Sequence, residues 1–170
     1  MNPAHLHLLL NHIPVLGVGF GLAVLGWATF RPRPDFARLA LVVFIVSALA
    51  AIPTYLSGEP AEGAIKGAAG VIEPWVEPHE DAALVSLILV ECLGALGLIT
   101  LWSARRAVSV PRPMLMASLV LALATAGSLA YTATLGGRIR HTEIRSGAAM
   151  SGAALPGEAG EANEKEHGER

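Results

Sequence analysis

The chain has 170 residues, of which 53% are hydrophobic and only 15% are charged, and its mean hydropathy is +0.53. A soluble domain carries about 25% charged residues, so this composition excludes an ordinary water-soluble protein and indicates a polytopic membrane protein. The net charge of -2 argues against nucleic acid as a partner. Cys92 is the only cysteine, which excludes an internal disulfide and a cysteine-based zinc site.

Four apolar runs predict an all-α fold, an antiparallel bundle of four transmembrane helices. Each run is close to or above the ~20 residues that cross a bilayer, and the runs cover about 4–30, 36–57, 82–102 and 114–135. Proline-rich turns make tight hairpins of the first two helices and of the last two. A long glycine-rich loop between the second and third helices is predicted to lie over one end as a lid. We expect the bundle to occupy 1–145, with 146–170 as a disordered acidic tail.

The distribution of arginine predicts the orientation in the membrane. Short connections rich in arginine stay on the cytoplasmic side, and the two hairpin turns and their flanks hold Arg31, Arg33, Arg38, Arg105, Arg106 and Arg112 against Asp35. The long loop holds Lys66 and five glutamates. Both termini and the long loop are therefore predicted on the outer, periplasmic side of a bacterial inner membrane.

Small residues indicate where helices approach each other closely. Gly17 and Gly21 form a GxxxG pattern in the first helix, and Ala122, Ala126 and Ala130 recur every four residues in the last. Such patterns let backbones pack tightly where lipid supplies no hydrophobic drive.

Histidines gather on the predicted outer side: His5, His7, His12, His79 and His141 all lie near outer helix ends. His7 and His12 are five residues apart, so on one helix they point about 140° from each other. They cannot chelate one ion together, and a shared site must combine residues from different helices. The sequence favours His12 with His79 as ligands, and His7 and His141 as substitutes or a second pair.

Three chemistries fit these histidines. Two imidazoles can ligate a b-type haem, with Arg138 and Arg140 beside its propionates. Three or four imidazoles, with Glu80 or Glu59, can bind copper, iron or zinc. Finally, interfacial histidines often bind no cofactor and hydrogen-bond headgroups or loop carbonyls.

The haem hypothesis predicts an electron-transfer or accessory subunit rather than a stand-alone enzyme. It would carry electrons between quinones, or a membrane or periplasmic oxidoreductase partner, and a periplasmic acceptor. The alternative is a non-catalytic metal-binding or purely structural membrane subunit.

Two further groups of acids stand out. Glu80 and Asp81 are predicted to cap the start of the third helix, where carboxylates suit the helix dipole. Glu91 lies near the middle of that helix, where a carboxylate is rare in a membrane protein. It fits either a proton relay below the outer site or a hydrogen bond to Ser47, Thr125 or Ser128.

The motif His7-x4-His12-Ile13-Pro14 resembles the His-Pro-x3-His-Phe-Pro opening of an uncharacterised bacterial family of four-helix membrane proteins. A histidine at the start of that family's third helix matches His79, and a glycine-pair motif after its last helix is similar to Gly136-Gly137-x-Ile139-x-His141. The resemblance covers about 4–145, and this chain departs from it with Leu8 in place of the first proline and Ile13 in place of the aromatic residue. It implies a shared fold and a shared histidine site, and no established activity.

Overall fold

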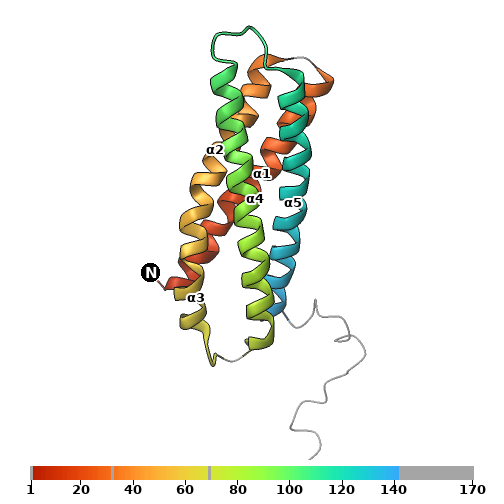
Figure 1. Cartoon of the computed structure of the whole chain (residues 1–170). Helices are drawn as coiled ribbons and strands as arrows, with labels where there is room; N and C mark the ends of the chain where they lie inside the picture. Colours follow the sequence, from red (N-terminus) through yellow and green to blue (C-terminus); the bar gives the residue numbers. More distant parts are fainter. Residues whose placement is uncertain (1, 32, 69, 142–170) are drawn as a thin grey trace, which may run out of the picture. The chain divides into compact units, whose positions relative to one another are not determined.

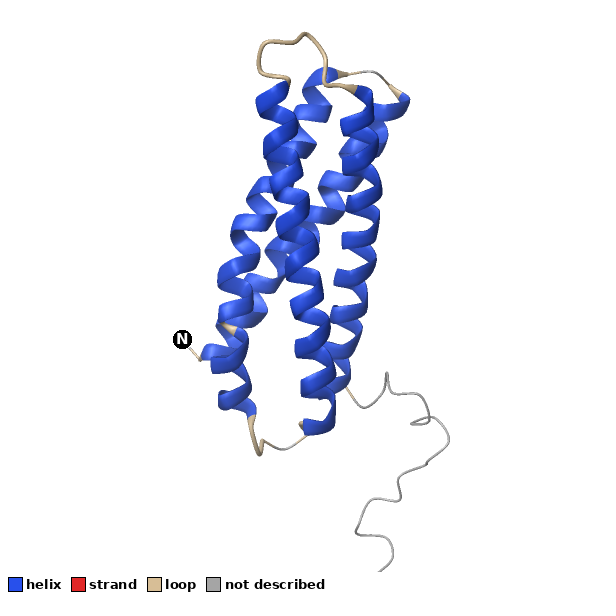
Figure 2. Ribbon diagram, viewed as in Figure 1, coloured by secondary structure: helices blue, strands red, loops and turns tan. Residues whose placement is uncertain are grey.

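The computed structural model describes residues 2–31, 33–68 and 70–141, and the fold is all-α. Four long helices lie side by side (Figures 1 and 2). They are α1 (Pro3–Phe30), α2 (Pro34–Leu56), α4 (Val76–Ser103) and α5 (Arg112–Arg140). The connection between α2 and α4 contains a short helix α3 (Gly58–Ile65) and a 3₁₀ turn η1 (Glu73–Trp75). The predicted four-helix fold is confirmed; the predicted tail at 146–170 lies outside the described residues.

The four long helices form one compact antiparallel unit, Met1–Arg140. Around the bundle, α1 packs against α2, α2 against α4, α4 against α5 and α5 against α1. Consequently α1 and α4 stand at opposite corners, as do α2 and α5. Each hairpin, α1–α2 or α4–α5, contributes one member of each diagonal pair.

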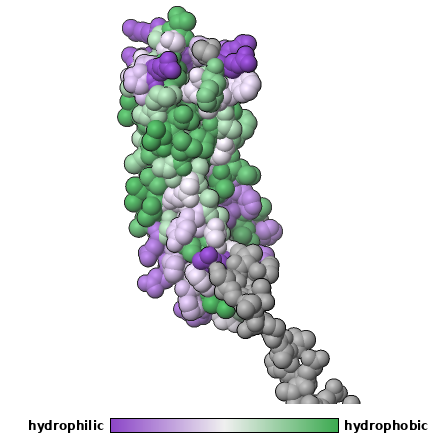
Figure 3. Space-filling model, turned by 90° about the vertical axis from the view of Figure 1, so that its right-hand side faces the viewer, coloured by the Kyte–Doolittle hydropathy of each residue, from purple (hydrophilic) through white to green (hydrophobic). Residues whose placement is uncertain are grey.

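All four helices are long and apolar enough to cross a membrane. In the most apolar window of each span only 22–33% of the residues are buried inside the protein, so most apolar side chains face outward. On the face drawn in Figure 3, hydrophobic residues form a belt between two more hydrophilic ends. Water does not stabilise such a surface, whereas lipid does. The chain is thus a multi-pass membrane protein.

The start of α4 differs from the prediction. This helix begins at Val76, six residues before the expected residue 82, and its N-cap Trp75 makes no side-chain capping hydrogen bond. Pro78 is tolerated because the first-turn amides have no partner within the helix. Glu80 and Asp81 therefore lie inside α4, and the prediction that they cap it was wrong.

The end of α5 also differs. The helix continues to Arg140, five residues beyond the expected end, through Gly136 and Gly137. Glycine weakens an isolated helix by about 1 kcal/mol, but packing against α4 favours a residue without Cβ at Gly136, where a Cβ would lie only 3.0 Å from the His79 ring. The extra turns place Arg138 and Arg140 on α5 itself.

Close packing of α1 against α2 confirms the predicted small-residue contacts. A Cβ on Gly17 would collide with Oγ of Ser47, and one on Gly21 would lie 2.5 Å from the ring of Phe44. On α5 the alanine series is only partly internal: Ala122 is fully buried, whereas Ala130 is exposed.

Helix α1 passes through Pro14 without a break. Proline has no amide hydrogen, so the carbonyl of Leu10, four residues earlier, loses its usual helical donor. The hydroxyl of Thr54 on α2 approaches this carbonyl, with Oγ1 3.2 Å from the oxygen. This contact joins α1 and α2 one turn from His7.

Candidate histidine site at one end of the bundle

His7 projects from the first turns of α1 toward α2. Its Nδ1 atom lies 3.1 Å from the carbonyl oxygen of Thr54 and 2.9 Å from Oγ of Ser57. The side chain is partly buried, and Gly58 at the start of α3 leaves space beside its Cε1. The α1–α2 hairpin and the first residue of α3 therefore hold this ring.

His79 occupies the corresponding place in the other hairpin. It lies in the first turns of α4, is partly buried, and its Nδ1 atom lies 3.0 Å from the carbonyl oxygen of Thr132 on α5. The ring also lies against Gly136: a Cβ there would be 3.0 Å from Cε1 and 3.2 Å from Nδ1 of His79. A Cβ at this position would require the imidazole to shift by a few tenths of an ångström.

The two threonines play equivalent parts in their hairpins. Thr54 and Thr132 each lie 20 residues after the first residue of their helix. The carbonyl of each threonine accepts from the histidine of its own hairpin. The hydroxyl of each contacts the helix that carries that histidine: Thr54 contacts Leu10 on α1, and Thr132 contacts Ser86 on α4. The histidines are thus held by two similar units at opposite corners of one end of the bundle.

The hydrogen bonds fix the tautomer of both rings. A carbonyl oxygen can only accept, so Nδ1 of His7 and Nδ1 of His79 carry the hydrogen and donate. In the neutral imidazole the unprotonated Nε2 atom is then the one that can bind a metal. The two rings are also close enough to interact electrostatically across the bundle.

This tautomer argues against a serine nucleophile activated by His7. Ser57 donates its hydroxyl hydrogen to the Thr54 carbonyl, at 2.7 Å. Its oxygen accepts from Nδ1–H of His7, which therefore has no lone pair there to remove a proton from Ser57.

His12 and His5 lie elsewhere on α1. His12 is exposed, and its Nδ1–H donates to the Leu8 carbonyl of its own helix. Its place five residues after His7 turns it about 140° around α1. His5 is exposed on α1, and His141, also exposed, directly follows α5. His7 is the histidine of α1 that interacts electrostatically with His79.

No group of three or more histidine, cysteine, aspartate or glutamate side chains within the described ranges is placed to hold a metal ion. The copper, iron or zinc hypothesis needs three or four imidazoles together with Glu80 or Glu59. Two imidazoles are enough for haem, because the porphyrin itself supplies the other ligands of the iron.

The two predicted haem-edge arginines lie at the end of α5. The guanidinium of Arg138 stacks over the ring of Trp75, 4.9 Å from its centroid. Arg140 is the last helical residue and is exposed. The amide of Ile72 also donates to the Ile139 carbonyl, at 3.1 Å, so the segment before α4 is tied to the end of α5.

Glu91 has neither predicted partner nor relay neighbour within the described residues. Its Oε1 atom is covered and makes no hydrogen bond. The three hydroxyls proposed as partners are used elsewhere: Ser47 donates to Val43, Thr125 donates to Leu121, and Ser128 pairs with Ser86.

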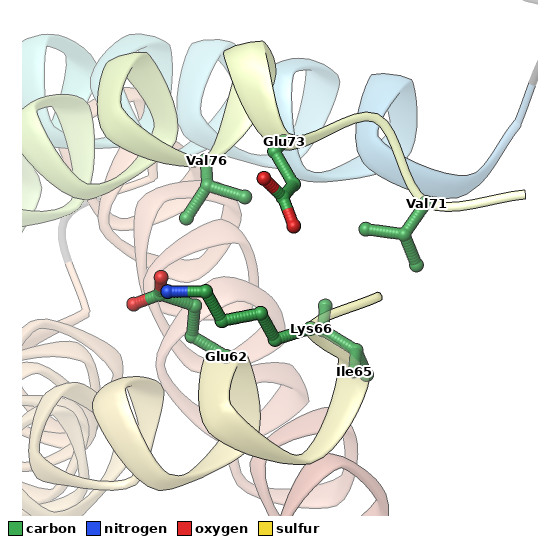
Figure 4. A pocket seen from close by; sticks show the side chains of 6 residues that line it. All are labelled: Glu62, Ile65, Lys66, Val71, Glu73 and Val76. Atoms are coloured by element: carbon green, nitrogen blue, oxygen red, sulfur yellow. The ribbon is translucent and has the colours of Figure 1, made fainter. Parts of the chain in front are cut away.

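Helix α3 follows α2 at the end of the bundle that holds His7 and His79, and it packs against α1. Figure 4 shows a small open pocket between α3 and the segment that leads into α4. Its lining residues are Glu62, Ile65, Lys66, Val71, Glu73 and Val76. None of them is a histidine, so this pocket is separate from the pair.

Sequence reasoning missed the residues that orient the histidines. Thr54, Ser57 and Thr132 act partly through backbone carbonyls, which carry no sequence signal. One hint was present on α5, where Ser128, Thr132 and Gly136 recur every four residues and so share one helix face.

Comparison with protein-family models, with characterised proteins and with solved structures finds no significant match. The predicted family resemblance is therefore supported only in its coarsest part, the presence of four long apolar helices.

Proposed function

We propose that this protein is an electron-transfer subunit of the membrane, in which His7 and His79 bind a b-type haem at the outer end of the bundle. The observation that carries the proposal is the matched pair of Nδ1–H to carbonyl hydrogen bonds, on histidines at opposite corners of the bundle. Imidazoles that bind a metal through Nε2 commonly donate Nδ1–H to a backbone carbonyl in this way.

The residues present fit such a group. The Nε2 atoms of His7 and His79 would bind the haem iron, and Gly136 has no Cβ to press on the His79 ring. Haem supplies one-electron chemistry. The protein orients the two imidazoles through the carbonyls of Thr54 and Thr132. Arg138 and Arg140 are the cations nearest in sequence to Gly136 for pairing with carboxylate groups.

The experiment is a titration of the detergent-purified apoprotein with hemin, followed by reduction with dithionite. The proposal predicts saturation at one haem per chain, a sharp Soret band, and narrow α and β bands after reduction. Absence of saturable binding in a folded preparation would reject it. Metal analysis of the same sample tests the copper, iron and zinc alternatives.

A structural role is the second candidate, and one observation favours it. Each histidine already joins two helices of its hairpin through a hydrogen bond to a carbonyl. If this is their whole purpose, His7→Ala and His79→Ala lower the thermal stability of the protein, and added hemin changes neither the spectrum nor the stability.

The proposal also places the histidine end on the periplasmic side. The opposite end carries the arginines of the two hairpin turns. Among them, Arg38 donates to the Ala107 carbonyl at 2.8 Å, and Arg105 stacks over Trp102, 4.3 Å from its ring centroid. Short connections rich in arginine are typical of the cytoplasmic side. Glu59→Cys and Ser109→Cys, each in a Cys92→Ser background, test this orientation when intact cells are treated with an impermeant maleimide. We expect labelling of Glu59→Cys only.

A further inference from the structure

A cluster of three hydroxyl groups, one of them buried, lies between α4 and α5 below His79. Oγ of Ser86 on α4 lies 2.7 Å from Oγ of Ser128 and 2.9 Å from Oγ1 of Thr132, both on α5. Ser86 is only 3% exposed. These three hydroxyls form a direct polar link between α4 and α5.

Thr132 connects this cluster to the histidine. Its hydroxyl contacts Ser86, and its carbonyl accepts from Nδ1–H of His79. His79 and Ser86 are seven residues apart, so both project from the same face of α4, two turns from each other. Two residues of α4 therefore hold one residue of α5, from above and from below.

We propose that Ser86 is a positioning residue: it fixes Thr132 so that the carbonyl of Thr132 sets the orientation of the His79 imidazole. The role of that orientation in cofactor binding rests on the proposed function, whereas the effect of Ser86 on the His79 ring does not. Ser86 acts through Thr132 and does not touch the imidazole itself.

The physical reason lies in the alternatives open to Thr132. Without Ser86, its hydroxyl can bond to the carbonyl four residues earlier in its own helix, as Thr134 does with Ala130. Such back-bonding bends a helix. In a membrane few other partners compete for a buried hydroxyl, so an interhelical hydrogen bond there fixes the helix register.

The α1–α2 hairpin provides an internal contrast. The carbonyl of Thr54 accepts from His7. Its hydroxyl donates to the Leu10 and Ala50 carbonyls, and no serine takes the place that Ser86 has beside Thr132. Ser47 is as buried as Ser86, but it bonds only to Val43 of its own helix. Ser47→Ala is therefore a matched control for Ser86→Ala, and Thr54→Val is the counterpart of Thr132→Val.

The test is the rate at which diethyl pyrocarbonate modifies each histidine of the detergent-purified apoprotein, resolved by peptide mass spectrometry. Ser86→Ala and the isosteric Thr132→Val should each raise the rate at His79 about fivefold, the factor that corresponds to one hydrogen bond of about 1 kcal/mol. The rate at His7 should stay unchanged. Thr54→Val should raise the rate at His7 and leave the rate at His79 unchanged. Ser47→Ala should change neither rate.

The double variant Ser86→Ala/Thr132→Val should match the single variants, because both remove the same link. Equal rates at His79 in Ser86→Ala and Ser47→Ala would overturn the proposal, and so would an equal rise at His7 and His79. Since this assay needs no haem, a protein that fails to bind hemin can still support the role of Ser86. A haem-binding protein with unchanged rates would reject that role alone.

Discussion

The imidazole of His79 lies directly against the backbone of Gly136, so close that a Cβ at this glycine would stand 3.0 Å from Cε1 of the ring. The same ring donates Nδ1–H to the carbonyl of Thr132, one turn earlier on α5. Helix α5 thus fixes both the position and the tautomer of a histidine that α4 supplies.

This contact makes Gly136→Ala the sharpest perturbation of the site that leaves every polar group in place. The added methyl group should displace the His79 ring at a cost of about 1–3 kcal/mol, and hemin affinity should fall roughly tenfold to a hundredfold. Gly127→Ala on the same helix is the control, because nothing lies within 4 Å of a Cβ there. Equal hemin affinities in the two variants would show that the His79 position does not matter for binding.

The seam between α1 and α2 should be sensitive to small increases in volume. Gly21→Ala forces the ring of Phe44, which is fully buried, to move. We expect a loss of about 1–3 kcal/mol in the free energy of unfolding, measured by denaturant titration in detergent. Gly19→Ala, where a Cβ meets nothing within 4 Å, should be neutral or slightly stabilising. Similar destabilisation by both variants would contradict the assigned packing.

Glu91 gives a third prediction. Its covered Oε1 atom has no partner within the described part of the chain, and an unsatisfied buried polar atom costs about 1–3 kcal/mol. Glu91→Leu should therefore raise the thermal unfolding midpoint, while Glu91→Gln should change it little. If Glu91 is instead a proton relay, both variants abolish proton uptake on reduction of the haem-loaded protein, which a stopped-flow pH indicator would detect.

The sequence was sufficient for the fold because its decisive signals are local. The length of each apolar run predicts a membrane-spanning helix, and the prolines between two runs predict a tight hairpin. Gly17 and Gly21 likewise predicted a close helix contact, since the pattern and its consequence lie on one helix.

The candidate site was harder to predict because it depends on which residues meet across the bundle. The rotation of α1 decides that His7 faces α2 and that His12 does not, and neither residue reveals this rotation alone. Thr54 and Thr132 orient the rings through backbone carbonyls, which any residue possesses. The continuation of α5 through Gly136 depends on packing against His79, a contact between residues 57 positions apart in sequence.

Low-temperature electron paramagnetic resonance of the hemin-loaded, oxidised protein tests whether His7 and His79 bind the same haem. The account predicts a low-spin ferric signal typical of two imidazole ligands, which His7→Ala and His79→Ala each convert to high spin and His12→Ala leaves intact. A low-spin signal that survives the loss of His7 but disappears in His12→Ala would contradict the account.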